Sequence, residues 1–185
     1  MMRNGTAILA AAGAALSASV AFAETAPAVP KPAPQMAQLN VFTGQWSCFG
    51  RQADSIFGTA HPIDTLQLGT ADLDGFWVVV RYTELRTGDN DHPSTGVYQY
   101  GYDPAGKQYL ATWTDNFGGW GTQTSPGWQG NKLVLTGDYN SNGQRIPARD
   151  TFEQASTTQI VHTSELQANG QWIPLQSETC SKQSG

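Results

Sequence analysis

The sequence predicts an all-β protein built as an antiparallel up-and-down barrel of about eight to ten strands. From Val41 onward, short runs of β-branched and aromatic residues alternate with turn residues at intervals of roughly 8–12 residues, the spacing of sandwiches and barrels. No segment of this body shows a sustained helical period. Two cysteines, Cys48 and Cys180, stand in the first and last of these runs. A disulfide between them would make the first and last strands neighbours, as they are in a closed barrel.

The individual strands are predicted from alternation and from turn chemistry. The strongest covers residues 75–86 (GFWVVVRYTELR), where valines and aromatic residues are concentrated. Residues 95–103 alternate, with three tyrosines on one face, and end in a turn at Asp103-Pro104-Ala105-Gly106. Asn142-Gly143 predicts a tight hairpin. One short helix is expected at residues 35–42, and further strands at 43–50, 63–71, 107–115, 120–128, 131–139, 144–152, 159–167 and 171–180.

The N-terminal residues predict export. Arg3 precedes an uncharged run over residues 7–22, and Ala21-Phe22-Ala23 has the form of a cleavage site, so residues 1–23 are expected to be a signal peptide. Residues 24–37 carry four prolines and are expected to be a disordered tether, with a partner-binding proline motif as the alternative. The barrel domain is then 38–182. We expect a periplasmic or secreted protein without a transmembrane anchor in the mature chain.

Composition and charge indicate which classes of partner to expect, and the predicted export indicates the state of the two cysteines. Charged residues are 14% of the 185, against roughly 25% in an average soluble domain. The formal net charge is −5 and the pI about 5.0, so nucleic acid is not an expected partner. In an exported chain the default for Cys48 and Cys180 is a disulfide, with two free thiols or an intermolecular bridge as alternatives.

Several short motifs, taken in order, resemble a known family. Thr43-Gly44-Gln45-Trp46 contains the Gly-x-Trp that opens the first strand of lipocalins and other calycins. It is followed by Asp72-Leu73-Asp74-Gly75, Gly101-Tyr102-Asp103 and Trp113-Thr114-Asp115. Together, over residues 39–180, they resemble an uncharacterised bacterial "domain of unknown function" family of exported calycin-like barrels. The resemblance implies a lipocalin-like barrel in which Trp46 is structural, and no established activity.

The chain departs from true lipocalins in two ways. No helix is expected near the C-terminus, and the last strand has no arginine to cover Trp46, because Lys182 is the only basic residue there. The ligand classes of lipocalins are therefore not carried over to this chain.

Aromatic residues are the first candidates for a ligand site. In a barrel they would line a pocket for an apolar or aromatic molecule, or else simply fill the core. The candidates for lining are Trp77, Tyr109, Trp113, Trp120 and Trp128. His162 joins them because it shares strand parity with Ile160 and Leu166 and should point inward. It would be the axial ligand of a haem-binding barrel, or a hydrogen-bonded core histidine.

Other motifs are weaker. Asp138-Tyr139-Asn140-Ser141-Asn142-Gly143 matches the first half of a calcium loop, but position twelve is Arg149, and a hairpin explains the same residues. No catalytic residue is assigned, and no metal or cofactor is expected. Asp103 and Asp115 would be a carboxylate pair only if they met; otherwise they cap turns.

These observations favour a barrel that binds a small apolar or aromatic molecule as a carrier, sensor or storage protein. Three alternatives stay open: an enzyme that uses acidic residues inside the barrel, an envelope interaction module with a filled core, and a haem-binding barrel. An interior cavity well below ~300 Å³ would count against ligand binding. Two titratable groups clustered in an enclosed cavity would favour the enzyme.

Overall fold

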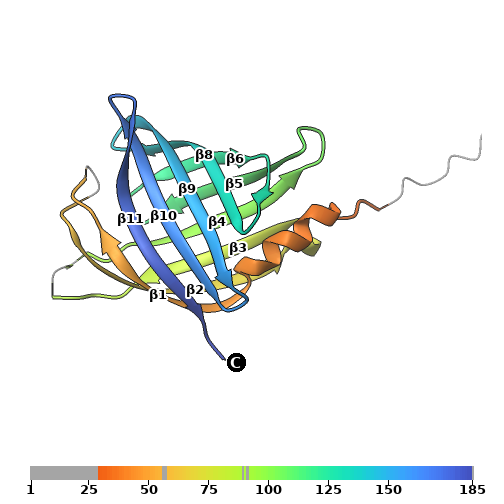
Figure 1. The fold of residues 1–185 in the computed structure, drawn as a ribbon, viewed down its shortest axis with the longest axis horizontal. Coiled ribbons are helices and arrows are strands. Elements are labelled where there is room, and N and C mark those ends of the chain that lie inside the picture. Colours follow the sequence, from red (N-terminus) through yellow and green to blue (C-terminus); the bar gives the residue numbers. More distant parts are fainter. Residues whose placement is uncertain (1–28, 56–57, 89, 91, 185) are drawn as a thin grey trace, which may run out of the picture. The chain divides into compact units, whose positions relative to one another are not determined.

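The computed structural model describes residues 29–184 except 56, 57, 89 and 91, and within them the chain forms an all-β barrel (Figure 1). Residues 1–23, the predicted signal peptide, lie outside the described part. The strands are β1 (Gly44–Gln52), β2 (His61–Asp72), β3 (Trp77–Glu84), β4 (Thr95–Asp103), β5 (Gln108–Asp115), β6 (Trp120–Ser125), β7 (Trp128–Gln129), β8 (Lys132–Ser141), β9 (Gln144–Ser156), β10 (Gln159–Ala168) and β11 (Gln171–Lys182). Two 3₁₀ helices are η1 (Pro34–Phe42) and η2 (Leu73–Gly75).

The sheet closes on itself. Each strand pairs antiparallel with its neighbour in sequence from β1 to β6 and from β8 to β11; β6 then pairs with β8, and β1 with β11. Ten strands thus form the ring, while the two-residue β7 lies beside β8 outside it. The predicted up-and-down barrel is confirmed, although the strand expected at 120–128 is two elements, β6 and β7.

A disulfide joins the first and last strands. Cys48 lies opposite Cys180 in the β1–β11 register, and their sulfur atoms are 2.04 Å apart. The sequence separation of 132 residues means that the bond closes almost the whole domain. A loop of that length corresponds to roughly 4–5 kcal/mol of stabilisation in the chain-entropy model. The predicted pairing is confirmed.

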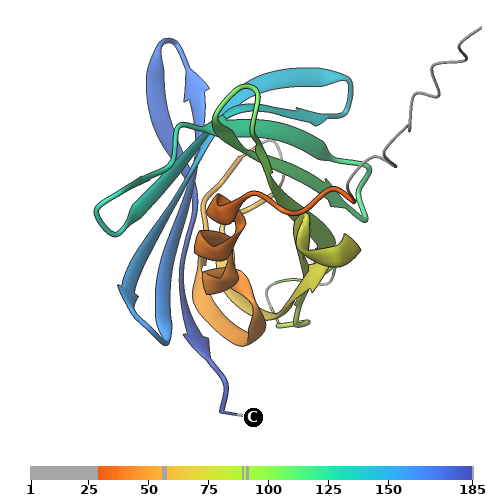
Figure 2. The ribbon, with the colours of Figure 1, turned by 90° about the vertical axis from the view of Figure 1, so that its right-hand side faces the viewer.

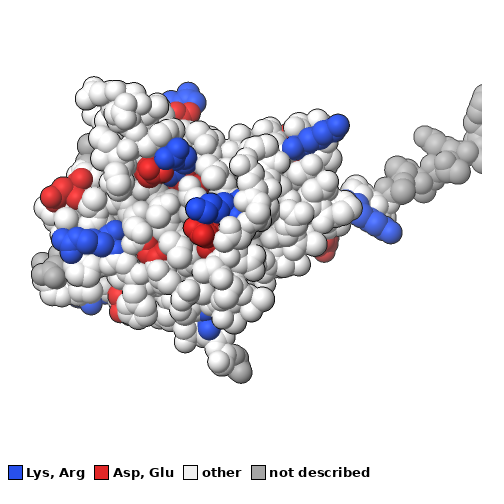
Figure 3. Space-filling view, in the orientation of Figure 1, with Lys and Arg blue, Asp and Glu red and all other residues white. Residues whose placement is uncertain are grey.

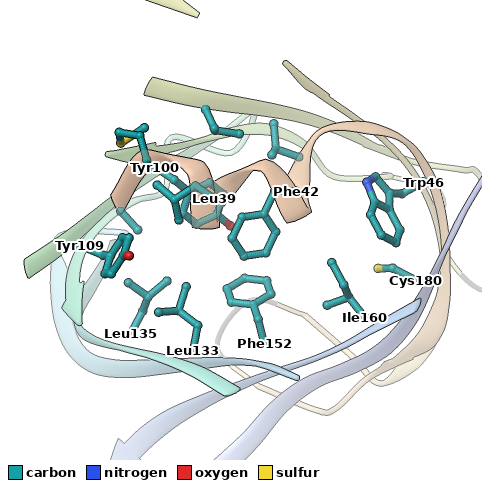
Figure 4. Close-up of a cluster of buried hydrophobic side chains, with 14 of the residues drawn as sticks. Leu39, Phe42, Trp46, Tyr100, Tyr109, Leu133, Leu135, Phe152, Ile160 and Cys180 are labelled. Carbon is teal, nitrogen blue, oxygen red and sulfur yellow. The ribbon is translucent and has the colours of Figure 1, made fainter. Parts of the chain in front are cut away.

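Helix η1 lies at one end of the barrel (Figure 2). A 3₁₀ helix has about three residues per turn, so residues three apart lie on one face. Met36, Leu39 and Phe42 have this spacing, and all three are buried against the barrel interior. Figure 4 shows Phe42 between Tyr100, which stacks at 4.7 Å, and Phe152, which meets it edge-on at 5.0 Å. This hydrophobic cluster occupies the end of the interior next to η1.

The helix begins slightly earlier than the sequence predicts. It was expected at 35–42 and starts at Pro34, a proline position that suits a helix N-terminus because no N–H is needed there. Residues 34–37, which the sequence assigns to the tether, are therefore part of the folded domain, and Met36 is buried in it. No helix among the described residues is long and apolar enough to cross a membrane.

The side of the barrel in Figure 3 carries few charges, and several of them lie next to an opposite charge. The ion pairs are Lys132–Glu153, Arg145–Asp138 and Arg149–Glu165, with N–O distances of 3.1, 2.5 and 2.6 Å. Exposed pairs of this kind contribute about 0–1 kcal/mol each. Stability must therefore come mainly from the interior and the disulfide.

Candidate functional site

A cavity of about 540 Å³ occupies the barrel interior at the end away from η1. This volume lies within the range of roughly 300–1,000 Å³ found for small-molecule sites. The loops that connect β1 to β2 and β3 to β4 contribute to its mouth through Thr59, Asn90 and His92. Its aromatic lining consists of Tyr82, Tyr98, Trp113, Phe117 and Tyr139. The titratable residues on its lining besides the tyrosines are His61, Glu84, His92, Asp115 and Glu178.

A hydrogen-bonded pair lies near the mouth. His61, at the start of β2, places Nε2 3.0 Å from Oε1 of Glu84, at the end of β3, and Nδ1 2.7 Å from the carbonyl oxygen of Thr59. The second oxygen of Glu84 accepts a hydrogen bond of 2.9 Å from the backbone N–H of Ser94. These contacts fasten the ends of two strands to the segment that enters β4, so they fix the shape of this side of the mouth.

A buried histidine lies behind the cavity floor, between two carboxylates. Nε2 of His162 is 2.9 Å from Oδ1 of Asp150, and Nδ1 is 3.0 Å from Oε1 of Glu178. The ring stacks on Phe152, with centroids 4.4 Å apart. A carboxylate only accepts hydrogen bonds, so both contacts form together only when His162 carries two ring protons. Burial lowers the pKa of His162, but the hydrogen bonds and negative charges of both carboxylates outweigh it and raise the pKa to about 9.

Asp150 is the most extensively hydrogen-bonded member of this cluster. Besides His162, it accepts hydrogen bonds of 2.5 Å from the hydroxyl of Tyr139 and 2.6 Å from Nε2 of Gln123. Burial works to raise the pKa of Asp150, but these donors and the charge of His162 hold it below its usual value. Burial and the nearby charge of Asp150 raise the pKa of Tyr139 well above the ordinary range, so its hydroxyl remains a donor. The cluster is thus a fixed set of oriented groups.

Glu178 connects the buried cluster to the cavity. It lines the cavity, and the exposed fraction of the residue is 4%. Oε1 faces His162 and lies 3.4 Å from Nε2 of Gln67. Oε2 has no hydrogen-bond partner among the residues that the structure describes. One positive charge on His162 lies between two carboxylates, so the formal charge of the three groups is −1.

Of the residues predicted to bind a ligand, Trp113 lines the cavity. Its ring lies 4.8 Å from that of Tyr139, and its Nε1 donates a 3.3 Å hydrogen bond to the hydroxyl of Tyr82. His162 does point inward, as its parity indicates, but it lies behind Glu178 rather than on the cavity lining. Trp113 therefore lines the cavity, whereas His162 lies among buried residues that include Phe152 and Glu178.

The other predicted residues lie elsewhere. Tyr109 and Trp128 belong to the hydrophobic cluster next to η1, where the Tyr109 hydroxyl donates a 2.8 Å hydrogen bond to Gln38. Trp77 lies over the backbone of Gly101, its partner across the β3–β4 pair, and Trp120 is half-exposed at the start of β6. None of these four is among the described residues that line the cavity.

The residues that sequence reasoning missed are Tyr82, Tyr98, Phe117, Tyr139 and Glu178. For two of them, the alternation of side chains along the strand indicated that the residue faces the barrel interior. Tyr98 belongs to the alternating tyrosines of β4, and Glu178 shares its parity with Cys180 in β11. Neither signal shows which end of the barrel interior a residue faces, because η1 determines which end is filled.

Trp46, to which the resemblance gives a structural role, packs against the last strand. It is buried at the start of β1, and Lys182, its partner in the β1–β11 register, places Nζ 5.3 Å from the centre of the indole ring. A lysine above an aromatic face is attracted by the ring quadrupole. Lys182 thus covers Trp46 in a chain that lacks an arginine at this end.

The weaker motifs serve as turns. Asn142 and Gly143 adopt φ values of 50° and 75° between β8 and β9, the two positive values of a tight hairpin turn, and Asp138 is paired with Arg145. Asp103 and Asp115 each accept backbone hydrogen bonds within their own turns.

His162 was also considered as an axial ligand of haem. Both of its ring nitrogens are hydrogen-bonded to carboxylates, so the ring offers no free nitrogen to iron. These residues do not fit haem ligation.

The ten strands of the ring define a closed antiparallel barrel, and solved structures share this fold. Rv2717c from M. tuberculosis superposes with a TM-score of 0.62 at 11% sequence identity, covering 83% of this chain and 100% of that chain. The S-type phycobiliprotein lyase CPES from Guillardia theta superposes with a TM-score of 0.55 at 12% identity, covering 80% and 92%. At such identities the likeness shows the fold alone.

The family model described as "Protein of unknown function (DUF1579)" matches residues 31–179, and the chain belongs to this family. No curated protein matches the chain. The match begins close to η1 and ends at Thr179 in β11, so it covers nearly the whole barrel.

Proposed function

We propose that this protein binds a small molecule with an aromatic or apolar body in the barrel cavity, as a carrier, sensor or storage protein. The observation that carries the proposal is the cavity of about 540 Å³ with five aromatic residues on its lining. Filling such a cavity with an apolar body removes apolar surface from water, at about 25 cal/mol for each Å². A ligand-free interaction module would have a filled core, and this half of the barrel interior is open.

The cavity wall is held in place before any ligand arrives. The hydroxyl of Tyr82 lies 3.0 Å from that of Ser94 and accepts the hydrogen bond from Trp113. The hydroxyl of Tyr139 is fixed by Asp150. Side chains that are already ordered lose little conformational entropy on binding, so such a site favours affinity. This arrangement supports a binding role.

A pair of tryptophan substitutions tests the proposal. Trp113→Ala removes an aromatic wall of the cavity, and Trp120→Ala removes a half-exposed tryptophan from the adjacent strand. With 2-naphthalenemethanol as a neutral aromatic probe, calorimetry should show binding to the wild type and a loss of about tenfold or more in W113A. W120A should bind like the wild type. Absence of binding by any aromatic probe, or equal losses in both variants, would refute the proposal.

We propose further that the protein is exported to the periplasm or secreted. The predicted signal peptide over residues 1–23 and the Cys48–Cys180 disulfide support this location, because disulfides persist in oxidising compartments. Mass spectrometry of the protein purified from its natural source tests the proposal. We expect a mature chain that begins at Glu24 and contains the disulfide. The same native spectra would reveal a co-purifying small molecule. An intact N-terminus in the cytoplasmic fraction would contradict export.

A second candidate is an enzyme, and the buried cluster favours it. Glu178 lines the cavity and is hydrogen-bonded to His162, which in turn contacts Asp150, so a proton on a bound molecule would lie within reach of a carboxylate backed by a charged histidine. An enzyme of this kind should convert a co-purifying molecule into a different compound, seen in its mass or its nuclear magnetic resonance spectrum, on incubation with the wild type but not with Glu178→Gln. A molecule left chemically unchanged by both proteins leaves binding as the function.

A further inference from the structure

We infer that the cavity selects ligands that carry a positively charged nitrogen, an ammonium group on an aromatic or apolar body, with the charge placed near Glu178. The inference rests on the proposed binding function and specifies its ligand class. Three independent features of the cavity support it: the sign of its charged lining, the unpaired oxygen of Glu178, and the aromatic wall.

Carboxylates outnumber basic side chains on the cavity lining, where His61 and His92 are the basic residues among those that the structure describes. Three carboxylates contribute to it, from Glu84, Asp115 and Glu178, and no lysine or arginine among the described residues does. Glu84 is paired with His61 at the mouth, and Asp115 accepts two backbone N–H groups of its own turn. A concave site with an excess of one sign of charge concentrates the field and raises the local concentration of the opposite ion. The cavity therefore attracts cations and repels anions.

Glu178 supplies the specific contact. It is the deeply buried carboxylate at the cavity floor, and the charge of His162 is shared between it and Asp150. Its Oε2 has no hydrogen-bond partner among the described residues, a costly state for a buried oxygen. An ammonium N–H reaching this carboxylate would form a charge-assisted hydrogen bond, about twice as strong as a neutral one. A carboxylate ligand has no proton to offer at neutral pH and would add repulsion.

The aromatic wall suits the same charge. The ring of Trp113 lies 6.5 Å from that of Tyr98 and 4.8 Å from that of Tyr139, and Tyr82 lies 5.7 Å from Tyr98. These rings form a connected group on the lining of the same cavity as Glu178. Aromatic faces attract cations, most strongly when the cation is desolvated. The hydroxyls of Tyr82 and Tyr139 are already hydrogen-bonded to Ser94 and Asp150.

Three probes of nearly equal shape test the inference on the wild-type protein. They are 2-naphthylmethylamine, which is a cation at neutral pH, 2-naphthalenemethanol, which is neutral, and 2-naphthoate, which is an anion. Calorimetry at pH 7 should give the tightest binding for the amine, by about tenfold over the alcohol, and the weakest for the acid. Binding of the alcohol or the acid as tight as that of the amine overturns the inference while leaving the proposed function intact. Absence of binding by all three refutes the proposed function itself.

Two variants that change the net charge equally locate the effect. Glu178→Gln keeps the size of the side chain and removes its charge, so the preference for the amine over the alcohol should fall to about twofold or less. Glu153→Gln removes a carboxylate from the outer face of the barrel, where it pairs with Lys132, and should leave the preference unchanged. Thermal unfolding checks that both variants fold. A preference that survives in E178Q, or disappears equally in E153Q, overturns the assignment to Glu178. If E178Q does not fold, the three probes on the wild-type protein still test the charge preference.

Discussion

The proton that His162 holds between two carboxylates should make the barrel less stable as the pH rises. The pKa of His162 is about 9 in the folded protein, against an ordinary value of 6.5. Between these two pH values the folded protein keeps a proton that the unfolded chain has released, so each step upward favours unfolding. The stabilisation is complete below about pH 6.5 and is lost as the pH passes through 9. At about 1.36 kcal/mol for each pH unit, the difference corresponds to ~3 kcal/mol.

Urea unfolding between pH 6 and pH 9.5 measures this loss directly. The free energy of unfolding of the wild type should fall by ~3 kcal/mol over the range, with most of the change above pH 6.5. His92→Gln, a change at an exposed histidine near the cavity mouth, should keep the same slope. His162→Gln should remove it, at the cost of lower stability throughout, because it leaves two buried carboxylates without their shared cation.

Nuclear magnetic resonance gives a second measurement that needs no variant. The imidazole signals of His162 should titrate near pH 9 in the folded protein. A midpoint near the ordinary value, or a free energy of unfolding that stays constant or rises from pH 6.5 to pH 9, would refute the assignment of a shared positive charge. A slope that persists in H162Q would place the titrating group elsewhere.

Three further predictions concern stability. Replacing Cys48 and Cys180 together by alanine should lower the free energy of unfolding by up to ~4–5 kcal/mol in urea titrations; an unchanged value would show that the strand pairing alone closes the barrel. Leu39→Ala leaves a void beneath η1 and should cost about 2–5 kcal/mol in the same assay, whereas less than about 1 kcal/mol would mean that the helix does not pack as described. Asp150→Asn should weaken the loss of stability at acid pH. The pKa of Asp150 is lower in the folded protein than its ordinary value of 3.8, so its charge stabilises the fold above pH 3.8, and this stabilisation is lost as the pH falls through the folded pKa. An acid dependence identical to that of the wild type would contradict this.

Local sequence patterns predicted most of the fold. The alternation in residues 95–103 placed the tyrosines on one face, and two of them, Tyr98 and Tyr100, line or pack in the interior. Asn142-Gly143 predicted the hairpin between β8 and β9, because two positive φ values are a local requirement of the turn. The cysteines predicted closure, because a disulfide fixes which strands are neighbours. Each of these signals is contained within a few residues or in one covalent bond.

The candidate site was predicted only in part, for a physical reason. Residue type indicated Trp113 and parity turned His162 inward, but strand parity distinguishes only the inside of the barrel from the outside. It does not show which end of the interior a side chain faces, so Tyr109 and Trp128 were grouped with Trp113, although they pack at the end that η1 fills.

The sequence by itself determined a closed antiparallel barrel, its disulfide and a largely aromatic interior. Periodicity and turn chemistry are properties of short segments, and two cysteines allow a single pairing within the chain. Only the tertiary structure decided the site. Asp150, His162 and Glu178 lie on three successive strands, and the register of β9, β10 and β11 brings them together, with His162 directly opposite Glu178. Shifting one strand by a single residue would turn its side chains to the other face and disperse the cluster. Register depends on the packing of the whole barrel, and η1 then leaves open the end of the interior where these residues lie.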